Sequence, residues 1–204
     1  MLARMGKIAG RTGALAAGLL LSGCFLAEDD SANPIIPAAS IAYPLPLGAA
    51  RECEGTGADQ KCNRAELRRR PGGGYEKLVW SKDEDGREGE PESSSYKIRP
   101  LVGGAIPRNT YLVQQISGDE DARYLGLMTR QSDGGWLSTE PNCDNLGPAD
   151  FVSFVNNRWI SSSSDRVENM KCEVKRAGLT DARLFTILDT PTKNSTPQVL
   201  YTGR

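Results

Sequence analysis

The sequence predicts an α+β fold: a mainly antiparallel β-sheet or small open barrel, stapled by disulfides, with a C-terminal helix against it. Three observations lead to this prediction. From Tyr75 onward, short apolar or alternating segments are separated by turn residues, which is typical of antiparallel strands. One late segment, 181–188, carries the signals of a helix. Four cysteines beyond position 24 can form two disulfides: Cys53, Cys62, Cys143 and Cys172.

The central part of the chain is expected to form a meander of five strands. Its strongest hairpin signal is Asp133-Gly134, because a tight turn needs positive φ at both central positions, which Asp tolerates and Gly adopts freely. Such a sheet must have its apolar face covered or curl toward a barrel. The five expected strands are 76–81, 96–102, 110–116, 124–129 and 135–139.

The flanking segments are less regular. The basic run 68–70, followed by Pro71 and three glycines, favours the solvated end of a short helix over an anion-binding patch. Residues 151–155 fit either a buried strand or a short helix capped by Asp150. Thr180 is expected to cap the helix at 181–188, with Leu179 and Leu184 as a hydrophobic staple. Further strands are expected at 159–160, 170–175 and 198–202.

The first 24 residues have the pattern of an export signal. Three basic residues without an acid precede an apolar run, 12–21, which is too short for a spanning helix and ends at Leu21-Ser22-Gly23-Cys24. This stretch resembles a bacterial lipoprotein signal peptide, whose last four residues form the lipobox. The resemblance implies that residues 1–23 are removed and that Cys24 is the lipid attachment site. Several acyl chains would make membrane attachment stable where one would not.

The domain prediction follows from that resemblance. Residues 24–40, with two prolines and few core-forming side chains, are expected to be a lipidated tether, and residues 41–204 a single exported α+β domain. In enteric-type lipoproteins an Asp after the lipidated cysteine favours the inner membrane. Phe25 stands there instead, so the resemblance implies an outer-membrane location, facing the periplasm or the outside.

The cysteine count is compatible with lipidation. The chain has five cysteines, and an odd number cannot all pair in disulfides, as is usual in an exported protein. If Cys24 carries lipid, four cysteines remain for disulfides. Three connectivities are then possible. We favour Cys53 with Cys62 and Cys143 with Cys172, because each pair brackets one contiguous segment. Zinc is disfavoured, since there is no CxxC motif and no histidine, and we predict no metal ligands and no cofactor.

Composition argues against several classes of function. Without residues 1–23, 22 Lys and Arg face 26 Asp and Glu, a net charge of −4 that disfavours nucleic acid as a partner. The absence of histidine removes the usual general base. Ser94-Ser95-Tyr96-Lys97 matches S-x-x-K, but in a strand positions i and i+3 point to opposite faces. The acidic links 83–92 and 119–121 do not match an EF-hand loop.

These observations favour a membrane-anchored lipoprotein with a non-catalytic binding or scaffolding domain, and we predict no catalytic residues. Its partners would be the membrane, through Cys24, and an unidentified protein or envelope polymer. Aromatic side chains in the strand region fit core packing better than an exposed binding row. Two alternatives stay open: an inhibitor of a wall-degrading, lysozyme-like enzyme, and a hydrolase that uses two carboxylates.

Overall fold

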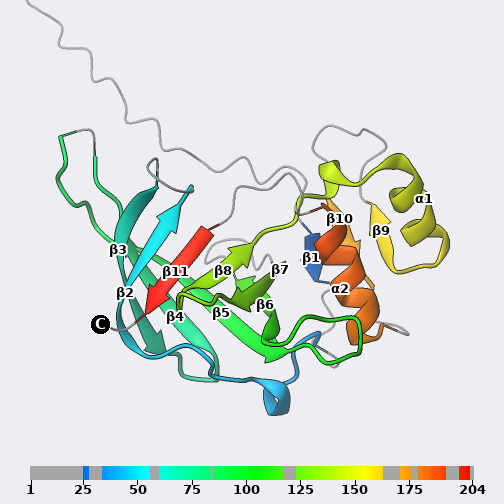
Figure 1. Ribbon diagram of the computed structural model, residues 1–204, viewed down its shortest axis with the longest axis horizontal. Coiled ribbons are helices and arrows are strands. Elements are labelled where there is room, and N and C mark those ends of the chain that lie inside the picture. The colour runs from blue at the N-terminus through cyan, green and yellow to red at the C-terminus, as the bar shows by residue number, and fades with distance from the viewer. Residues whose placement is uncertain are drawn as a thin grey trace, which may run out of the picture.

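The computed structural model describes residues 25–27, 34–55, 60–83, 85–116, 123–162, 171–175, 179–191 and 198–202. Eight antiparallel strands form a barrel, and a smaller part with two helices packs beside it (Figure 1). The barrel strands are β2 (Gly48–Glu54), β3 (Lys61–Arg69), β4 (Tyr75–Trp80), β5 (Glu92–Pro100), β6 (Thr110–Ile116), β7 (Arg123–Arg130), β8 (Trp136–Thr139) and β11 (Gln198–Thr202).

The barrel is closed, so the prediction of an open barrel is wrong. Strands β4 to β8 form the expected five-stranded meander, and β6 has the predicted bounds. Closure comes from the C-terminal strand β11, which pairs with β2 on one side and β8 on the other; Val199 lies opposite both Cys53 and Leu137. This pairing joins the first and last strands of the barrel and therefore leaves no edge in the ring.

Strands β2 and β3 were not predicted from the sequence. The expected helix end at 68–70 is wrong, because Arg68 and Arg69 belong to β3 and pair with Glu76 and Tyr75 of β4. The chain turns after them through three glycines with positive φ. Gly74 shows why glycine is needed there, since a Cβ would come within 2.1 Å of the Tyr96 carbonyl oxygen.

The smaller part of the molecule covers the outer face of β6 and β7. It contains β1 (Phe25–Ala27), η1 (Ala38–Ser40), η3 (Cys143–Asn145), α1 (Pro148–Asn156), β9 (Ile160–Ser162), β10 (Cys172–Val174) and α2 (Asp181–Asp189). A second core lies here, between Leu112, Leu125 and Leu127 of the barrel wall and the side chains of α2. Residues 151–155 are helical, but α1 is capped by Gly147 with Pro148 at its first position, not by Asp150, which lies in its first turn.

The described part of the segment expected to be a tether is packed into this core. Phe25 is fully buried, Ala27 is 7 % exposed, and β1 lies between β7 and β10 in the sheet. Ile35 and Ile36 are buried in the same core. The prediction of a tether over 24–40 is therefore wrong for these residues, and the folded domain begins before residue 41.

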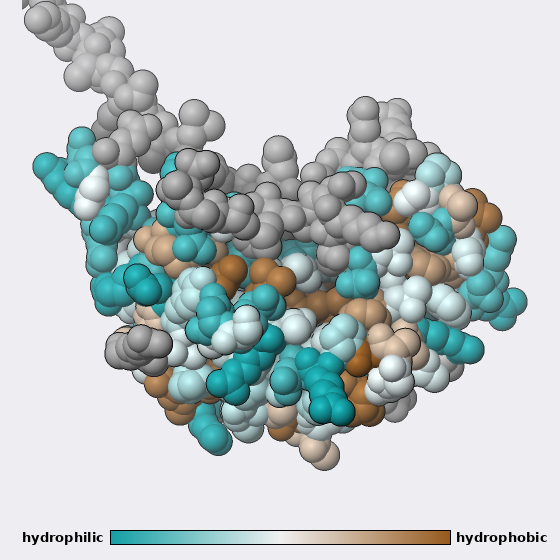
Figure 2. All heavy atoms as spheres, viewed as in Figure 1, coloured by the Kyte–Doolittle hydropathy of each residue, from teal (hydrophilic) through white to brown (hydrophobic). Residues whose placement is uncertain are grey.

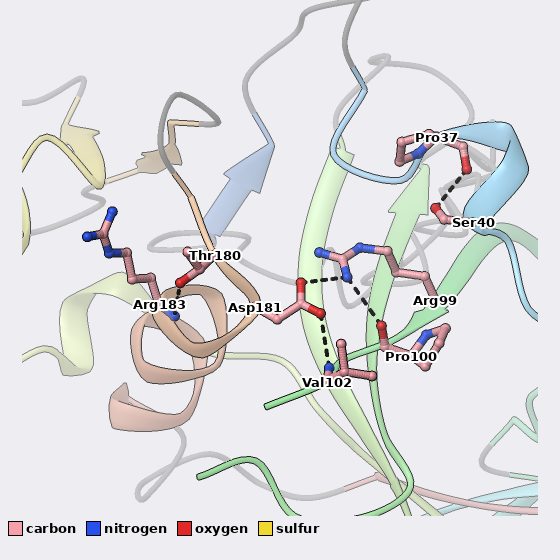
Figure 3. A network of polar contacts seen from close by, with 8 residues as sticks. All are labelled: Pro37, Ser40, Arg99, Pro100, Val102, Thr180, Asp181 and Arg183. Atoms are coloured by element: carbon pink, nitrogen blue, oxygen red, sulfur yellow. Dashed lines mark hydrogen bonds and ion pairs between the residues drawn. The ribbon is translucent and has the colours of Figure 1, made fainter. Parts of the chain in front are cut away.

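Helix α2 is held against the barrel by a small polar network (Figure 3). Arg99 Nη1 of β5 donates to Asp181 Oδ1 at 2.7 Å, and the Val102 backbone N–H donates to Asp181 Oδ2 at 3.0 Å. Thr180 is the N-cap as predicted, its hydroxyl accepting from the Arg183 N–H. Leu184 is buried and Leu179 packs against the same core, as a hydrophobic staple requires.

Both predicted cysteine pairs are present. Cys53 and Cys62 lie opposite each other on β2 and β3, with their Cα atoms 4.0 Å apart. Cys143 and Cys172, with Cα atoms 5.8 Å apart, join η3 to β10 within the second core. The first disulfide closes a hairpin, whereas the second ties the end of the meander to the strand that pairs with β1.

The visible barrel wall is largely hydrophilic, with hydrophobic side chains in smaller patches (Figure 2). None of the helices within the described ranges is long and apolar enough to cross a bilayer.

Candidate binding site in the barrel mouth

The inside of the barrel is layered from apolar to polar. Its closed end is packed with apolar side chains and sealed by Tyr75, which is fully buried and whose hydroxyl donates to the Leu45 carbonyl at 3.0 Å. The Leu45 N–H donates back to the same hydroxyl at 2.9 Å. Burial raises the pKa of Tyr75 to about 12. The void left in this layer is only about 40 Å³, little more than the volume of one water molecule.

The other end of the barrel is open and polar. It forms a cavity of about 300 Å³, which we call the barrel mouth. Five residues line both the mouth and the void beneath it, so they form a polar layer above the apolar floor: Glu52, Lys77, Tyr96, Glu140 and Gln198. The remaining residues of the mouth are Asn63, Val79, Ser81, Glu92, Ser93, Ser94, Gln115 and Tyr124.

Strand alternation places these polar side chains inside. Along β4, Tyr75, Lys77 and Val79 share the inner face, and Lys77 lies opposite Ser94 of β5. On β2, Glu52 lies opposite Asn63 of β3 on that same face. The mouth is therefore polar because Glu52, Asn63 and Lys77 occupy inward positions at one end of three neighbouring strands.

A buried ion pair is the centre of the polar layer. Lys77 Nζ donates to Glu52 Oε1, and the two side chains are only 13 % and 19 % exposed. The ammonium also lies 5.1 Å from the Tyr96 ring centroid, within range of a cation–π interaction. Desolvation lowers the pKa of Lys77, but Tyr96 and Glu52 outweigh it and hold that pKa well above its usual range. Lys77 is therefore charged at every physiological pH.

Glu140 adds a third charged group to the layer. Desolvation of its carboxyl raises the pKa of Glu140, Lys77 acts in the opposite direction, and Glu52 adds to the rise. The residue as a whole is exposed, which limits the size of the effect. With Glu92 on the rim, three carboxyl groups and one ammonium line the mouth. The site therefore has a negative bias and suits hydrogen-bond donors or a cation.

The residues singled out from the sequence are distributed unevenly around this site. Cys24 lies outside the described residues, as do 117–122 of the second acidic link. Of the aromatic residues, Tyr96 and Tyr124 line the mouth, whereas Tyr75 and Trp136 belong to the barrel core and Trp159 stacks on Phe154. Within the described ranges, no three Cys, Asp or Glu side chains are arranged so that they could hold a metal ion.

The S-x-x-K segment lies within β5. Ser94 faces the mouth and donates to the Tyr96 hydroxyl at 2.9 Å, while alternation places Lys97 on the other face. The pair that meets inside the barrel is instead Lys77 and Glu52, which sequence reasoning missed. One signal was available: Lys77 stands between Tyr75 and Val79 in an alternating segment, so it shares their face.

Comparison with known proteins adds no relative, since no family model, no curated protein and no solved structure matches this chain.

Proposed function

We propose that this chain is a lipoprotein of the bacterial outer membrane, anchored through Cys24, whose domain binds its ligand without catalysis at the barrel mouth. The proposal of an anchor is supported by the Leu21-Ser22-Gly23-Cys24 stretch. The proposal of binding is supported chiefly by one observation: polar groups converge on an open cavity of about 300 Å³ above a closed, packed floor. A cavity of that size is at the small end of ligand sites.

Two physical features of the mouth favour binding. The Lys77 and Glu52 side chains are largely buried and hold each other in place, so these two lose little side-chain entropy when a ligand makes contacts. The Lys77–Glu52 pair offers a donor and acceptors side by side. Tyr96 and Tyr124 add aromatic surface to the same cavity.

Photo-crosslinking in cells tests this proposal. A benzophenone amino acid is placed at Gln115, in the mouth, and as a control at Ser132, an exposed residue of the β7–β8 turn at the other end of the barrel. We expect a light-dependent adduct from position 115 and none from position 132. Equal labelling from both positions would contradict a site in the mouth. An adduct with a lysozyme-like enzyme would instead support the inhibitor alternative.

Membrane fractionation tests the anchor. We expect Cys24→Ala to release the protein from the membrane fraction. The control variant Ser22→Ala keeps Cys24 as the lipid attachment site, so this protein should stay in the membrane fraction. Unchanged membrane retention of the Cys24→Ala protein would show that the lipoprotein proposal is wrong.

A carboxylate-based hydrolase is the second candidate, and one observation favours it. Glu52, which is ion-paired, and Glu140, whose pKa desolvation raises, line the same cavity, and two carboxyl groups in contrasting environments are what acid–base hydrolysis needs. Release of reducing ends from envelope glycans that disappears in Glu140→Gln would establish it. The engagement of Glu52 by Lys77 weakens that carboxylate as a nucleophile, so binding remains our first proposal.

A further inference from the structure

A row of side chains leads from the inside of the barrel onto the neighbouring strands. Strand register places six residues opposite one another, each on the next strand: Tyr96 of β5, Gln115 of β6, Tyr124 of β7, Leu26 of β1, Glu173 of β10 and Ser161 of β9. Side chains of directly opposite residues share one face of a sheet. The inner face of the barrel therefore continues onto the face of β1, β10 and β9 that carries Leu26.

Burial shows that this face points away from the second core. On β10, Cys172 and Val174 are buried in that core, whereas Glu173 between them is only partly buried. Strand β1 alternates in the same way, with Leu26 between two buried residues. Helices α1 and α2 contribute to the second core, so they pack on the side of the sheet opposite to the row.

Two hollows lie along this row and meet at one side-chain pair. The first is the barrel mouth, and the second, which we call the outer hollow, has a volume of about 260 Å³. The outer hollow is lined by Leu26, Ser161, Ser162, Lys171 and Glu173. Tyr124 lines the mouth and lies opposite Leu26, and the Cβ atoms of such a pair are about 5 Å apart. The mouth and the outer hollow are therefore adjacent parts of one groove.

The groove is long compared with the mouth alone. Its inner end is at Tyr96, which lies opposite Tyr75 of the barrel floor. From β5 to β9 the row crosses five strand spacings of about 4.8 Å, so it extends about 24 Å along the sheet. That length exceeds the reach of a disaccharide and suits a ligand that is itself extended.

The side chains of the groove fit a carbohydrate better than a peptide. Hydroxyl, amide and carboxylate groups supply donors and acceptors along it, and the rings of Tyr96 and Tyr124 add apolar faces. A sugar presents hydroxyls at its edge and C–H groups on its faces, so it can use both. A peptide is usually held by a strand edge or by apolar pockets. This groove instead runs across the strands, and Leu26 is the one large aliphatic side chain among the described residues of the outer hollow.

The charges of the groove favour a neutral chain. Three carboxyl groups and one ammonium line the mouth, a balance that disfavours an anionic polymer. In the outer hollow, the Glu173 carboxylate accepts from Lys175 Nζ at 2.5 Å and from Ser161 Oγ at 3.2 Å. This carboxylate is thus already paired with a cation, and it keeps further lone pairs for the hydroxyls of a ligand.

We propose that the barrel mouth is the inner end of an extended groove that binds a linear, neutral glycan, whose end enters the barrel and whose following units lie across β1, β10 and β9. This inference rests on the proposed binding function of the mouth and names the class of its ligand. It accounts for the small volume of the mouth, which holds one end of a longer ligand.

Chain length tests the groove. The purified protein is titrated calorimetrically with dimers and hexamers of N-acetylglucosamine, glucose and mannose. We expect at least one hexamer to bind about tenfold more tightly than its dimer, because each hydrogen bond gained beyond the mouth contributes about two- to tenfold in affinity. Equal affinity of hexamer and dimer would overturn the groove and leave the mouth as the whole site.

Variants at the outer end locate the added contacts. Ser161→Ala and Glu173→Gln should each weaken hexamer binding by about two- to tenfold and leave dimer binding unchanged, which also shows that the variants are folded. Gln115→Ala, in the mouth, should weaken both. Ser132→Ala, in the β7–β8 turn at the other end of the barrel, is the matched control and should change neither. Hexamer affinity that is unaffected by both outer variants would contradict the inference.

Failure of this inference can be told apart from failure of the proposed function. A protein adduct by photo-crosslinking from Gln115, together with no affinity for any of these glycans, would keep the mouth as a binding site but show that its ligand is a protein. No adduct from Gln115 and no glycan binding would contradict the proposed function itself.

Discussion

The Lys77–Glu52 pair offers the clearest energetic test of the site. Replacing Lys77 with Met keeps most of the side-chain volume but leaves Glu52 in the barrel without its cation. Breaking a fully buried pair costs about 3–5 kcal/mol, and an exposed pair contributes about 0–1 kcal/mol. Because the two side chains are 13 % and 19 % exposed, we expect a loss of about 2–3 kcal/mol in the free energy of unfolding.

Thermal and urea unfolding of the oxidised protein at pH 7 measure this loss. For a chain of this length, each kcal/mol lowers Tm by about 2–4 °C, so Lys77→Met should lower Tm by about 4–12 °C. Lys82→Met is the matched control, because Lys82 is exposed in the segment between β4 and β5. This substitution should change the free energy of unfolding by less than about 0.5 kcal/mol.

A double-mutant cycle separates the pair from other effects. Adding Glu52→Gln to Lys77→Met removes the uncompensated charge and should restore more than half of the lost stability. The reasoning would be refuted if Lys77→Met stayed within about 0.5 kcal/mol of the parent, or if the second substitution made the loss larger.

Three further outcomes follow from individual contacts. Thr110→Val should raise the free energy of unfolding by about 1 kcal/mol in urea titrations, because the Thr110 hydroxyl is buried without a hydrogen-bond partner in the described structure; destabilisation would show that it has one. Asp181→Ala should cost about 1–3 kcal/mol, since Arg99 and the Val102 N–H both lose their acceptor, and equal stability would contradict the role of that network. Desolvation raises the pKa of Glu140, so its contribution favours folding at low pH and is lost as pH rises; Glu140→Gln should therefore raise Tm relative to the parent more at neutral pH than at about pH 4, and an equal difference at both would count against it.

Local signals made the meander predictable. Strand β6 alternates or runs apolar between clear turns, and Asp133-Gly134 marks a hairpin as expected. The predicted primed turn is wrong, however, because Asp133 does not have positive φ: the Gly134 N–H donates to the Gln131 carbonyl, which makes Ser132 and Asp133 the central residues, and only Gly134 has positive φ, of 87°. Helix α2 was predictable for the same reason, since its cap and its staple lie within a few residues of each other.

Closure of the barrel depends on pairings that no local pattern encodes. Strands β2 and β3 carry mostly charged residues outward and small ones, Ala50 and Ala65, inward, so their hydrophobic alternation is weak. The pairing of β11 with β2 joins segments that lie far apart in the sequence, since Gln198 pairs with Glu54 and Thr202 with Ala50. Strand β1 was missed because three residues followed by polar ones have the composition of a linker, although Phe25 is fully buried.

The candidate site could not be predicted for the same reason, because it depends on pairings between distant segments. A lysine in a strand is normally exposed, and only the closed ring shows that Lys77 and Glu52, from strands separated by β3, meet inside it. The Lys77–Glu52 pair therefore requires knowledge of the strand order, whereas the cysteine pairs could be predicted because each brackets one contiguous segment.

Amide hydrogen exchange tests most directly whether the barrel mouth is where this protein binds. The purified protein is compared alone and with a detergent extract of the envelope of its own cells. We expect slower exchange at the mouth ends of β5, β6 and β7, around Ser93, Gln115 and Tyr124, and unchanged exchange in the turn around Ser132. Protection of the Ser132 turn with no change at the mouth would contradict the assignment of the site.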